Sequence, residues 1–216
     1  MSRLTPPSAM RGPFAGAEED TAVDLRSHDV ARTLRALVEA NDARSVLVVG
    51  VDRGVQGLST RLAAAEARAG RATILVDADL REPSDFAAAG SRIASGGLSA
   101  WLLDHDTSEG SAPPGEPSDV PNLSVIHRGE RAVQAADALD GPRLDDLVPA
   151  LLRQADRVVI ASSPLWLHAD ALSFARRVDQ VLVVINPGRT RRDAAIAARD
   201  AIRLAGGRIA GIVLDT

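Results

Sequence analysis

The stretch GVDRGVQGLST at residues 50–60 contains the residue types from which proteins build phosphate-binding loops. It follows a short apolar run and precedes a helix-like run, so the sequence predicts a strand, a loop and a helix in that order. In such a loop, glycines let backbone N–H groups close around phosphates, and a Ser or Thr hydroxyl binds magnesium. Gly54, Gly57, Ser59 and Thr60 supply these elements here.

One position of the loop departs from that pattern. Leu58 stands where the lysine that bridges the terminal phosphates belongs. An aliphatic side chain can neither neutralise a phosphate nor stabilise the charge that develops during phosphoryl transfer. All 25 basic residues of the chain are arginines, so no lysine elsewhere can take its place. The loop alone is as compatible with an ordinary strand-turn-helix as with a nucleotide site.

A second polar cluster follows the next predicted strand, at residues 72–79, with Asp77, Asp79 and Arg81 at its end. Ligands of parallel sheets bind at the carboxyl ends of the strands. Carboxylate and hydroxyl oxygens suit magnesium, so Ser59 and Asp77 are the candidate metal ligands. Alternatively, the acids cap the following helix or pair with an arginine such as Arg81.

The remaining chain alternates short apolar, β-branched runs with runs of helical spacing. This order predicts an α/β fold, a single domain whose parallel β-sheet carries helices on both faces, and the loop at 50–60 would make it P-loop NTPase-like. Strands are predicted at 45–50, 72–79, 122–127, 156–164, 180–188 and 209–216, and helices at 27–40, 58–69, 96–104, 143–155, 169–178 and 190–207, with a Pro/Gly/Ser loop at 107–121.

The amino-acid composition limits which domain organisation and which binding partners we expect for this chain. Residues 1–25 are rich in Pro, Gly, Ala and acids without periodicity, so we expect a flexible N-terminal arm before one domain at 26–216. The net charge of −4 gives no reason to expect nucleic acid as a partner. The longest apolar runs are too short to span a membrane, and the N-terminus does not resemble a signal peptide. These features predict a cytoplasmic protein without direct membrane insertion.

The segment ILVDADLREP at 74–83 resembles the second Walker-like motif of bacterial tyrosine kinases of the capsule and exopolysaccharide assembly type. That motif is an apolar run followed by D-x-D-x-R, which Asp77, Asp79 and Arg81 match in full. Its spacing of about 20 residues from the loop is also that of the family. Further segments resemble the family in the same order, over roughly residues 27–216: GGLSAWLLD, PNLSVIHRG, DALSFARRVDQVLVVINPGRT and GGRIAGIVLD.

The segment DVARTLRAL resembles the helix of this family that carries E-x-x-R-x-x-R and meets the neighbouring subunit of a ring. Asp29, Arg32 and Arg35 occupy the matching positions. The resemblance therefore implies an oligomer interface at these residues, while an ordinary amphipathic surface helix is the alternative. It also implies self-association, or association with an active kinase or a membrane polysaccharide co-polymerase that recruits the chain to the inner face of the membrane.

The resemblance further implies ATP or ADP with Mg as cofactors. Their binding residues would be Arg53, Gly54, Gly57, Ser59, Thr60, Asp77, Asp79 and Arg81. Arg53 stands where the related partitioning ATPases carry an additional lysine. It either pairs with phosphate bidentately or is simply solvated.

Three departures from the family predict a weak or lost nucleotide site. The loop of the family has P-G-E-G-K-S/T-T, with Leu58 here in place of the lysine. Its Walker B strand ends in D-T-P-P, and Ala161 stands at the aspartate. The tyrosine-rich tail that these kinases phosphorylate has no counterpart, because the 216 residues end at Thr216 and contain no tyrosine. The sequence thus predicts a catalytically inactive pseudokinase, with an active kinase with an atypical loop or a partitioning-type ATPase as alternatives.

Overall fold

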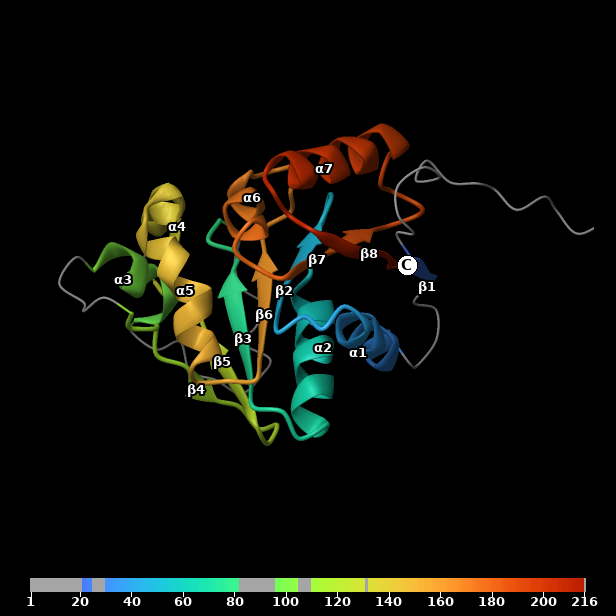
Figure 1. Cartoon of the computed structure of the whole chain (residues 1–216). Coiled ribbons are helices and arrows are strands. Elements are labelled where there is room, and N and C mark those ends of the chain that lie inside the picture. The colour runs from blue at the N-terminus through green and yellow to red at the C-terminus, as the bar shows by residue number, and fades with distance from the viewer. Residues whose placement is uncertain (1–20, 25–29, 82–95, 105–109, 131, 216) are drawn as a thin grey trace, which may run out of the picture.

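A computed structural model gives the fold (Figure 1). It describes residues 21–24, 30–81, 96–104, 110–130 and 132–215. Strands and helices alternate along most of this length, as the apolar patterns predict.

An eight-stranded sheet runs through the molecule in the order β1-β8-β7-β2-β6-β3-β5-β4. Every neighbouring pair is parallel except β4 and β5, which are antiparallel. All six residues of β2 and all six of β3 are buried, as expected for strands covered on both faces. The strands are β1 Thr21–Asp24, β2 Ser45–Gly50, β3 Thr73–Ala78, β4 Glu116–Pro117, β5 Leu123–Ile126, β6 Arg157–Ser162, β7 Gln180–Ile185 and β8 Ile209–Leu214.

Helices cover both faces of the sheet, which confirms the predicted fold class. One face carries α1 (Val30–Ala40) and α2 (Gln56–Arg68), which pack on each other and on the sheet. The helices whose buried side chains join the core of the opposite face are α3 Gly97–Leu103, α4 Ala132–Ala136, the 3-10 turn η2 Asp137–Asp140, α5 Arg143–Leu152, α6 Asp170–Ala175 and α7 Arg192–Leu204.

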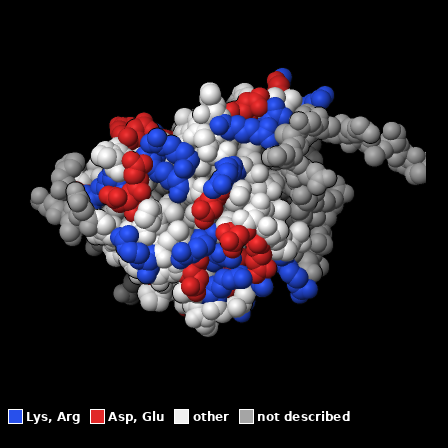
Figure 2. Space-filling view, viewed as in Figure 1, with Lys and Arg blue, Asp and Glu red and all other residues white. Residues whose placement is uncertain are grey.

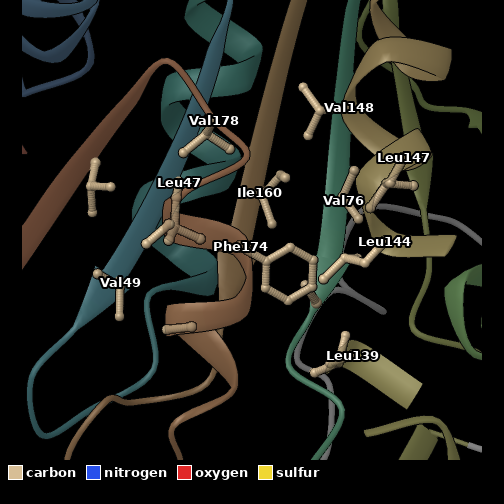
Figure 3. Packing of buried hydrophobic residues seen from close by; sticks show 14 of the residues in the cluster. Leu47, Val49, Val76, Leu139, Leu144, Leu147, Val148, Ile160, Phe174 and Val178 are labelled. Carbon is tan, nitrogen blue, oxygen red and sulfur yellow. The ribbon is translucent and has the colours of Figure 1, made fainter. Parts of the chain in front are cut away.

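The alternation of strand side chains divides the apolar core into two clusters. On the α5–α7 face, the fully buried ring of Phe174 on α6 lies among strand residues such as Ile160 and Val76 and helix residues such as Leu144 (Figure 3). Burying a side chain of this size contributes roughly 1.5–3 kcal/mol relative to leaving it exposed. This cluster fixes the sheet from one side, so the loops at the strand ends are held by a rigid base.

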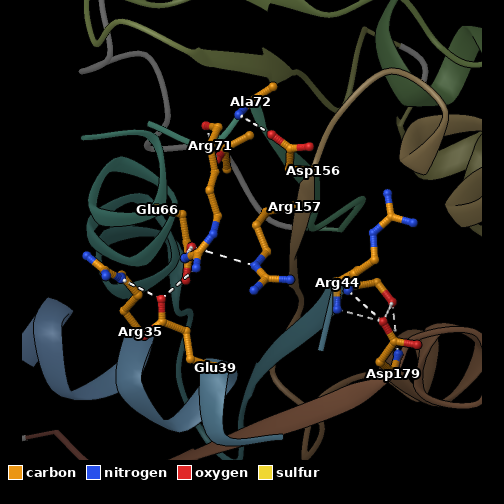
Figure 4. Close-up of polar contacts among 11 residues, drawn as sticks. Arg35, Glu39, Arg44, Glu66, Arg71, Ala72, Asp156, Arg157 and Asp179 are labelled. Carbon is orange, nitrogen blue, oxygen red and sulfur yellow. Dashed lines mark hydrogen bonds and ion pairs between the residues drawn. The ribbon is translucent and has the colours of Figure 1, made fainter. Parts of the chain in front are cut away.

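Polar contacts tie the strands together at their amino ends (Figure 4). Asp179 Oδ2 accepts hydrogen bonds from the backbone N–H groups of Arg44 and Ser45, each at 2.8 Å, and from the Ser45 hydroxyl at 2.9 Å. Asp156 accepts a bond of 3.0 Å from the N–H of Ala72. These contacts fix where β2, β3, β6 and β7 start, and therefore where their carboxyl ends lie.

A chain of charged side chains joins α1, α2 and β6 (Figure 4). The Glu66 carboxylate is buried and lies 2.6 Å from Arg71 Nη1 and 3.6 Å from Arg157 Nε. Arg71 Nη2 also contacts Glu39 at 2.7 Å, and Glu39 accepts a bond of 3.2 Å from Arg35. A buried carboxylate is tolerated only when such partners compensate its lost hydration.

Four elements differ from the sequence prediction. The expected N-terminal arm at 1–25 contains β1, which pairs with β8, while the rest of that arm lies outside the described residues. The expected loop at 107–121 contains β4, which pairs with β5. Both are short edge strands, whose pairing depends on a neighbouring strand rather than on their own pattern. The short helix α4 and the turn η2 were not predicted either.

No helix in the described part of the chain is both long and apolar enough to cross a lipid bilayer. On the face shown in Figure 2, arginines lie interspersed with carboxylates. That face therefore presents mixed charge rather than a field of one sign.

The Glu39 contact predicts a pH-dependent contribution to stability. The hydrogen bond from Arg71 holds the pKa of Glu39 below its ordinary value, and the hydrogen bond and charge of Arg35 lower this pKa further. A carboxylate whose pKa is lowered in the folded state stabilises the protein fully when the pH is above the pKa of the unfolded state, about 4.3 for Glu. That stabilisation is lost as the pH falls from this value through the lowered pKa of the folded state. Glu39→Gln should therefore lower the free energy of unfolding at pH 7 and have a smaller effect at about pH 3.5. Urea unfolding at both pH values measures this, and an equal loss at both would contradict it.

Candidate functional site

The candidate site forms where the carboxyl ends of β2, β6 and β3 lie side by side. These strands are neighbours in the sheet, with Val48 of β2 and Asp77 of β3 both paired with Ala161 of β6. Because the strands are parallel, the loop after β2 and the acids after β3 meet at one edge. The structure thus brings the two predicted motifs together.

Backbone contacts fix the start of the loop between β2 and α2. Gly50 accepts a hydrogen bond of 2.9 Å from the N–H of Leu165, and Val51 accepts one of 2.8 Å from the N–H of Trp166. The chain then turns so tightly that a Cβ atom on Gly50 would lie 2.0 Å from the backbone oxygen of Arg53. Only glycine fits such a close approach.

Leu58 lies in the first turn of α2 with 8% of its surface exposed. It belongs to the apolar cluster between α1, α2 and the sheet, together with Val55, Leu62 and the fully buried Ala161. The two positions at which the resemblance leads us to expect a charge are therefore apolar residues of one cluster. Neither supplies a group that could bind phosphate or hold a magnesium-bound water.

The hydroxyls of the loop bind within the first turn of α2. Ser59 Oγ is buried and donates a hydrogen bond of 2.8 Å to the carbonyl of Val55. Thr60 Oγ1 donates one of 2.8 Å to the carbonyl of Gln56. Such bonds to the preceding turn use the hydroxyl within the helix. In this arrangement Ser59 is not presented to a metal ion.

Asp77 and Asp79 are buried, with exposed fractions of 0% and 1%. The N–H of Asp79 donates to Asp77 Oδ1 at 3.3 Å, and Gln56 Nε2 donates to Asp79 Oδ2 at 3.1 Å. Gln56 is not among the residues that the phosphate-loop pattern identifies. Its place between Gly54 and Gly57 was the available signal, because a side chain there stands at the centre of the loop.

The two arginines of the predicted site pair with carboxylates outside it. Arg53 Nη1 lies 3.2 Å from Asp215 after β8, and about half of its side chain is exposed. Arg81 contacts Asp170 of α6 through two nitrogens, at 2.9 and 3.1 Å, and the hydrogen bond to Asp170 raises the pKa of Arg81. The Arg81 guanidinium therefore pairs with Asp170, while the backbone N–H of Arg81 donates a hydrogen bond of 3.3 Å to Asp79 Oδ1 of its own motif.

The predicted interface residues are only partly described. Arg32 is exposed on α1, and Arg35 pairs with Glu39 one turn along the helix, while Asp29 lies outside the described residues.

Among the described residues, no group of three or more His, Asp or Glu side chains has the arrangement that a metal ion needs. In the first turn of α2, Leu58 offers no positive charge to a phosphate, and the Ser59 hydroxyl is buried and bonded within the helical turn.

No protein-family model matches the chain. Over 181 residues it is 27% identical to tyrosine-protein kinase CpsD of Streptococcus agalactiae, covering 81% of this chain and 74% of that protein. Over 191 residues it is 26% identical to tyrosine-protein kinase YwqD of Bacillus subtilis, covering 85% and 78%. The chain is thus similar in sequence to bacterial tyrosine-protein kinases over about four fifths of its length.

Solved structures of a tyrosine kinase domain and of two other proteins have the same fold. The kinase domain of Escherichia coli tyrosine kinase ETK superposes with a TM-score of 0.74 at 22% identity, over 86% of this chain and 73% of that one. The chimerical protein CapA2B2 gives 0.73 at 23% identity, over 86% and 82%. MinD from Pyrococcus horikoshii, solved with Mg-ADP, gives 0.65 at 19% identity, over 79% and 69%. These likenesses confirm the P-loop ATPase fold.

The loop glycines predict opposite effects of substitution. Gly50→Ala should lower the free energy of unfolding by about 2 kcal/mol or more, because the new methyl group meets backbone that cannot move aside. Gly57→Ala meets no atom within 4 Å and should raise stability by up to about 1 kcal/mol, because alanine favours a helix. Thermal and urea unfolding of both variants measures this. Equal destabilisation by the two would contradict the loop geometry.

We expect truncation of Leu58 to lower the free energy of unfolding as much as truncation of a core residue does. Leu58→Ala should lower the free energy of unfolding by about 2–4 kcal/mol, because it removes apolar contacts beneath α2 and leaves a cavity. Leu204→Ala, at a side chain that is 91% exposed at the end of α7, is the matched control and should change stability by less than about 0.5 kcal/mol. A Leu58 variant as stable as the control would show that this position is not part of the core.

Proposed function

We propose that this chain is a catalytically inactive homologue of bacterial tyrosine kinases that acts as a regulatory or assembly partner in exopolysaccharide or capsule biosynthesis. One observation carries the proposal. Leu58 and Ala161 replace a lysine and an aspartate of the family, and both are buried in one apolar cluster. Phosphoryl transfer depends on positioned charges around the phosphates, and two of them are absent.

The contacts of the loop support the same proposal. The side chains of Asp52, Arg53 and Gln56 bind Thr190, Asp215 and Asp79, respectively. The hydroxyl groups of Ser59 and Thr60 bind carbonyls of the loop and the first helical turn. A nucleotide would have to displace these contacts without the attraction of a lysine, so its net binding energy would be small.

A chain that keeps the kinase fold but does not transfer phosphate would act by binding other proteins. The resemblance to the kinase family implies self-association through α1 or association with an active kinase or a membrane co-polymerase. We propose a cytoplasmic location for the chain, with recruitment to the inner face of the membrane by such a partner. In that role, the loop is a structural element that holds α2 on the sheet.

An active kinase with an atypical loop is the second candidate, because the relatives are named tyrosine-protein kinases. In that case Arg53 would leave Asp215 and supply the missing positive charge. The phosphate acceptor would be a tyrosine of another protein, since this sequence contains none. A partitioning ATPase is a weaker candidate, because the likeness to MinD concerns the fold alone.

Calorimetric titration with Mg-ATP and Mg-ADP tests the proposal. The natural chain should give no binding heat and transfer no phosphate to a tyrosine-containing acceptor, because the loop offers no cation to the phosphates. A Leu58→Lys, Ala161→Asp variant should bind nucleotide if the frame of the site is preserved. Self-association is measured on the same samples by sedimentation, where Arg32→Glu on the exposed face of α1 should weaken it.

The charged variant needs a control for folding, because both replaced residues are buried and Ala161 pairs with Asp77 across the sheet. A new carboxylate beside a buried one is unfavourable without a cation. Thermal unfolding with and without magnesium therefore accompanies each titration. Micromolar binding together with phosphate transfer by the natural chain would refute the proposed function.

A further inference from the structure

The carboxamide of Gln56 lies in the middle of the loop. Gln56 Oε1 lies 2.3 Å from the point that a Cβ atom of Gly54 would occupy, and Cδ and Nε2 of Gln56 lie 3.1 and 3.2 Å from it. The other end of the same amide donates a hydrogen bond of 3.1 Å to Asp79. The side chain therefore bridges the loop and the end of β3.

This position blocks the loop sterically. A glycine in a phosphate-binding loop leaves room for the ligand to approach the backbone. At Gly54 the amide of Gln56 fills that room, whereas at Gly57 no atom lies within 4 Å of the corresponding point. An oxyanion approaching Gly54 would have to displace the Gln56 side chain.

The hydrogen bond to Asp79 keeps the side chain in place. Asp79 is 99% buried, and a buried carboxylate requires hydrogen-bond donors. A carboxamide can donate to this acid, yet it carries no net charge that would attract an anion. Moving Gln56 away would thus remove one donor from Asp79 as well as open the loop.

The backbone around Gln56 is held on both sides, so the side chain is the part that can move. Before it, Asp52 Oδ2 accepts a hydrogen bond of 3.0 Å from Thr190, and Gly50 fits closely against Arg53. After it, the carbonyl of Gln56 accepts the bond from Thr60. A rotamer change needs only the Asp79 bond to break, whereas a loop rearrangement would break several contacts.

We propose that Gln56 controls ligand access to the loop: its carboxamide, which lies between Gly54 and Asp79, prevents polyphosphates from binding there. Removing this side chain opens the loop to a magnesium nucleotide, and restoring the charge at position 58 alone does not open it fully. The inference rests on the proposed function, because it explains how a preserved loop is kept empty of nucleotide.

The test compares Gln56→Ala with Gln154→Ala, each in the natural chain and in a Leu58→Lys background. Gln154 is an exposed glutamine after α5, so it controls for the loss of a glutamine amide. Calorimetry with Mg-ADP should show at least about tenfold tighter binding with Gln56→Ala than with Gln154→Ala in at least one background. Circular dichroism and thermal unfolding establish that each variant is folded.

A second measurement remains informative if the lysine variant is destabilised. In nuclear magnetic resonance spectra, the side-chain amide resonance of Gln56 is assigned by its absence in Gln56→Ala. This resonance should shift when Mg-ADP binds to any folded variant that retains Gln56. Binding that leaves this resonance unchanged would overturn the proposal. So would equal affinities of the Gln56 and Gln154 variants in both backgrounds, or no binding by any variant.

These outcomes are separate from those of the proposed function. If the natural chain binds nucleotide and transfers phosphate, the proposed function fails. Tenfold tightening by Gln56→Ala would still show that Gln56 restricts the loop. If the natural chain neither binds nor transfers and Gln56→Ala changes nothing, the proposed function stands and Gln56 has no part in it.

Discussion

The packing of α2 on the sheet is the contact on which the candidate site depends. Val55, Leu58 and Leu62 bury the start of this helix in the same apolar cluster as β2, β3 and β6. The helix start and the strand ends therefore hold the loop from both sides. In a charged phosphate site, the ligand itself supplies part of that order. Here apolar burial of the start of α2 contributes to that order.

The site nevertheless keeps two buried carboxylates. Asp77 and Asp79 lie at the end of β3, while Leu58 at the start of α2 is apolar. Buried acids need donors, which they receive here from the chain itself, including the N–H of Asp79 and the amide of Gln56. Buried acids are thus compatible with an apolar side chain at Leu58, because neutral hydrogen-bond donors satisfy part of the hydrogen-bonding requirement of the acids.

Much of the fold could be predicted because the strands bury both faces and so appear as continuous apolar runs. The runs at 45–50 and 180–188 correspond to β2 and β7. The elements that were missed are short and lie at the edges, such as β1 and β4. Two to four residues carry no periodicity, and their structure depends on the strand beside them.

The sequence by itself determined the alternation of strands and helices and the apolar side chains at positions 58 and 161, because these follow from residue types and spacing along the chain. Only the tertiary structure decided which partners the polar residues have. Arg81 binds Asp170, which lies 89 positions away, and Gln56 binds Asp79 across 23 positions. Such contacts depend on the order of strands in the sheet. The physical reason is that a side chain selects its partner by proximity in space, which a one-dimensional pattern does not contain.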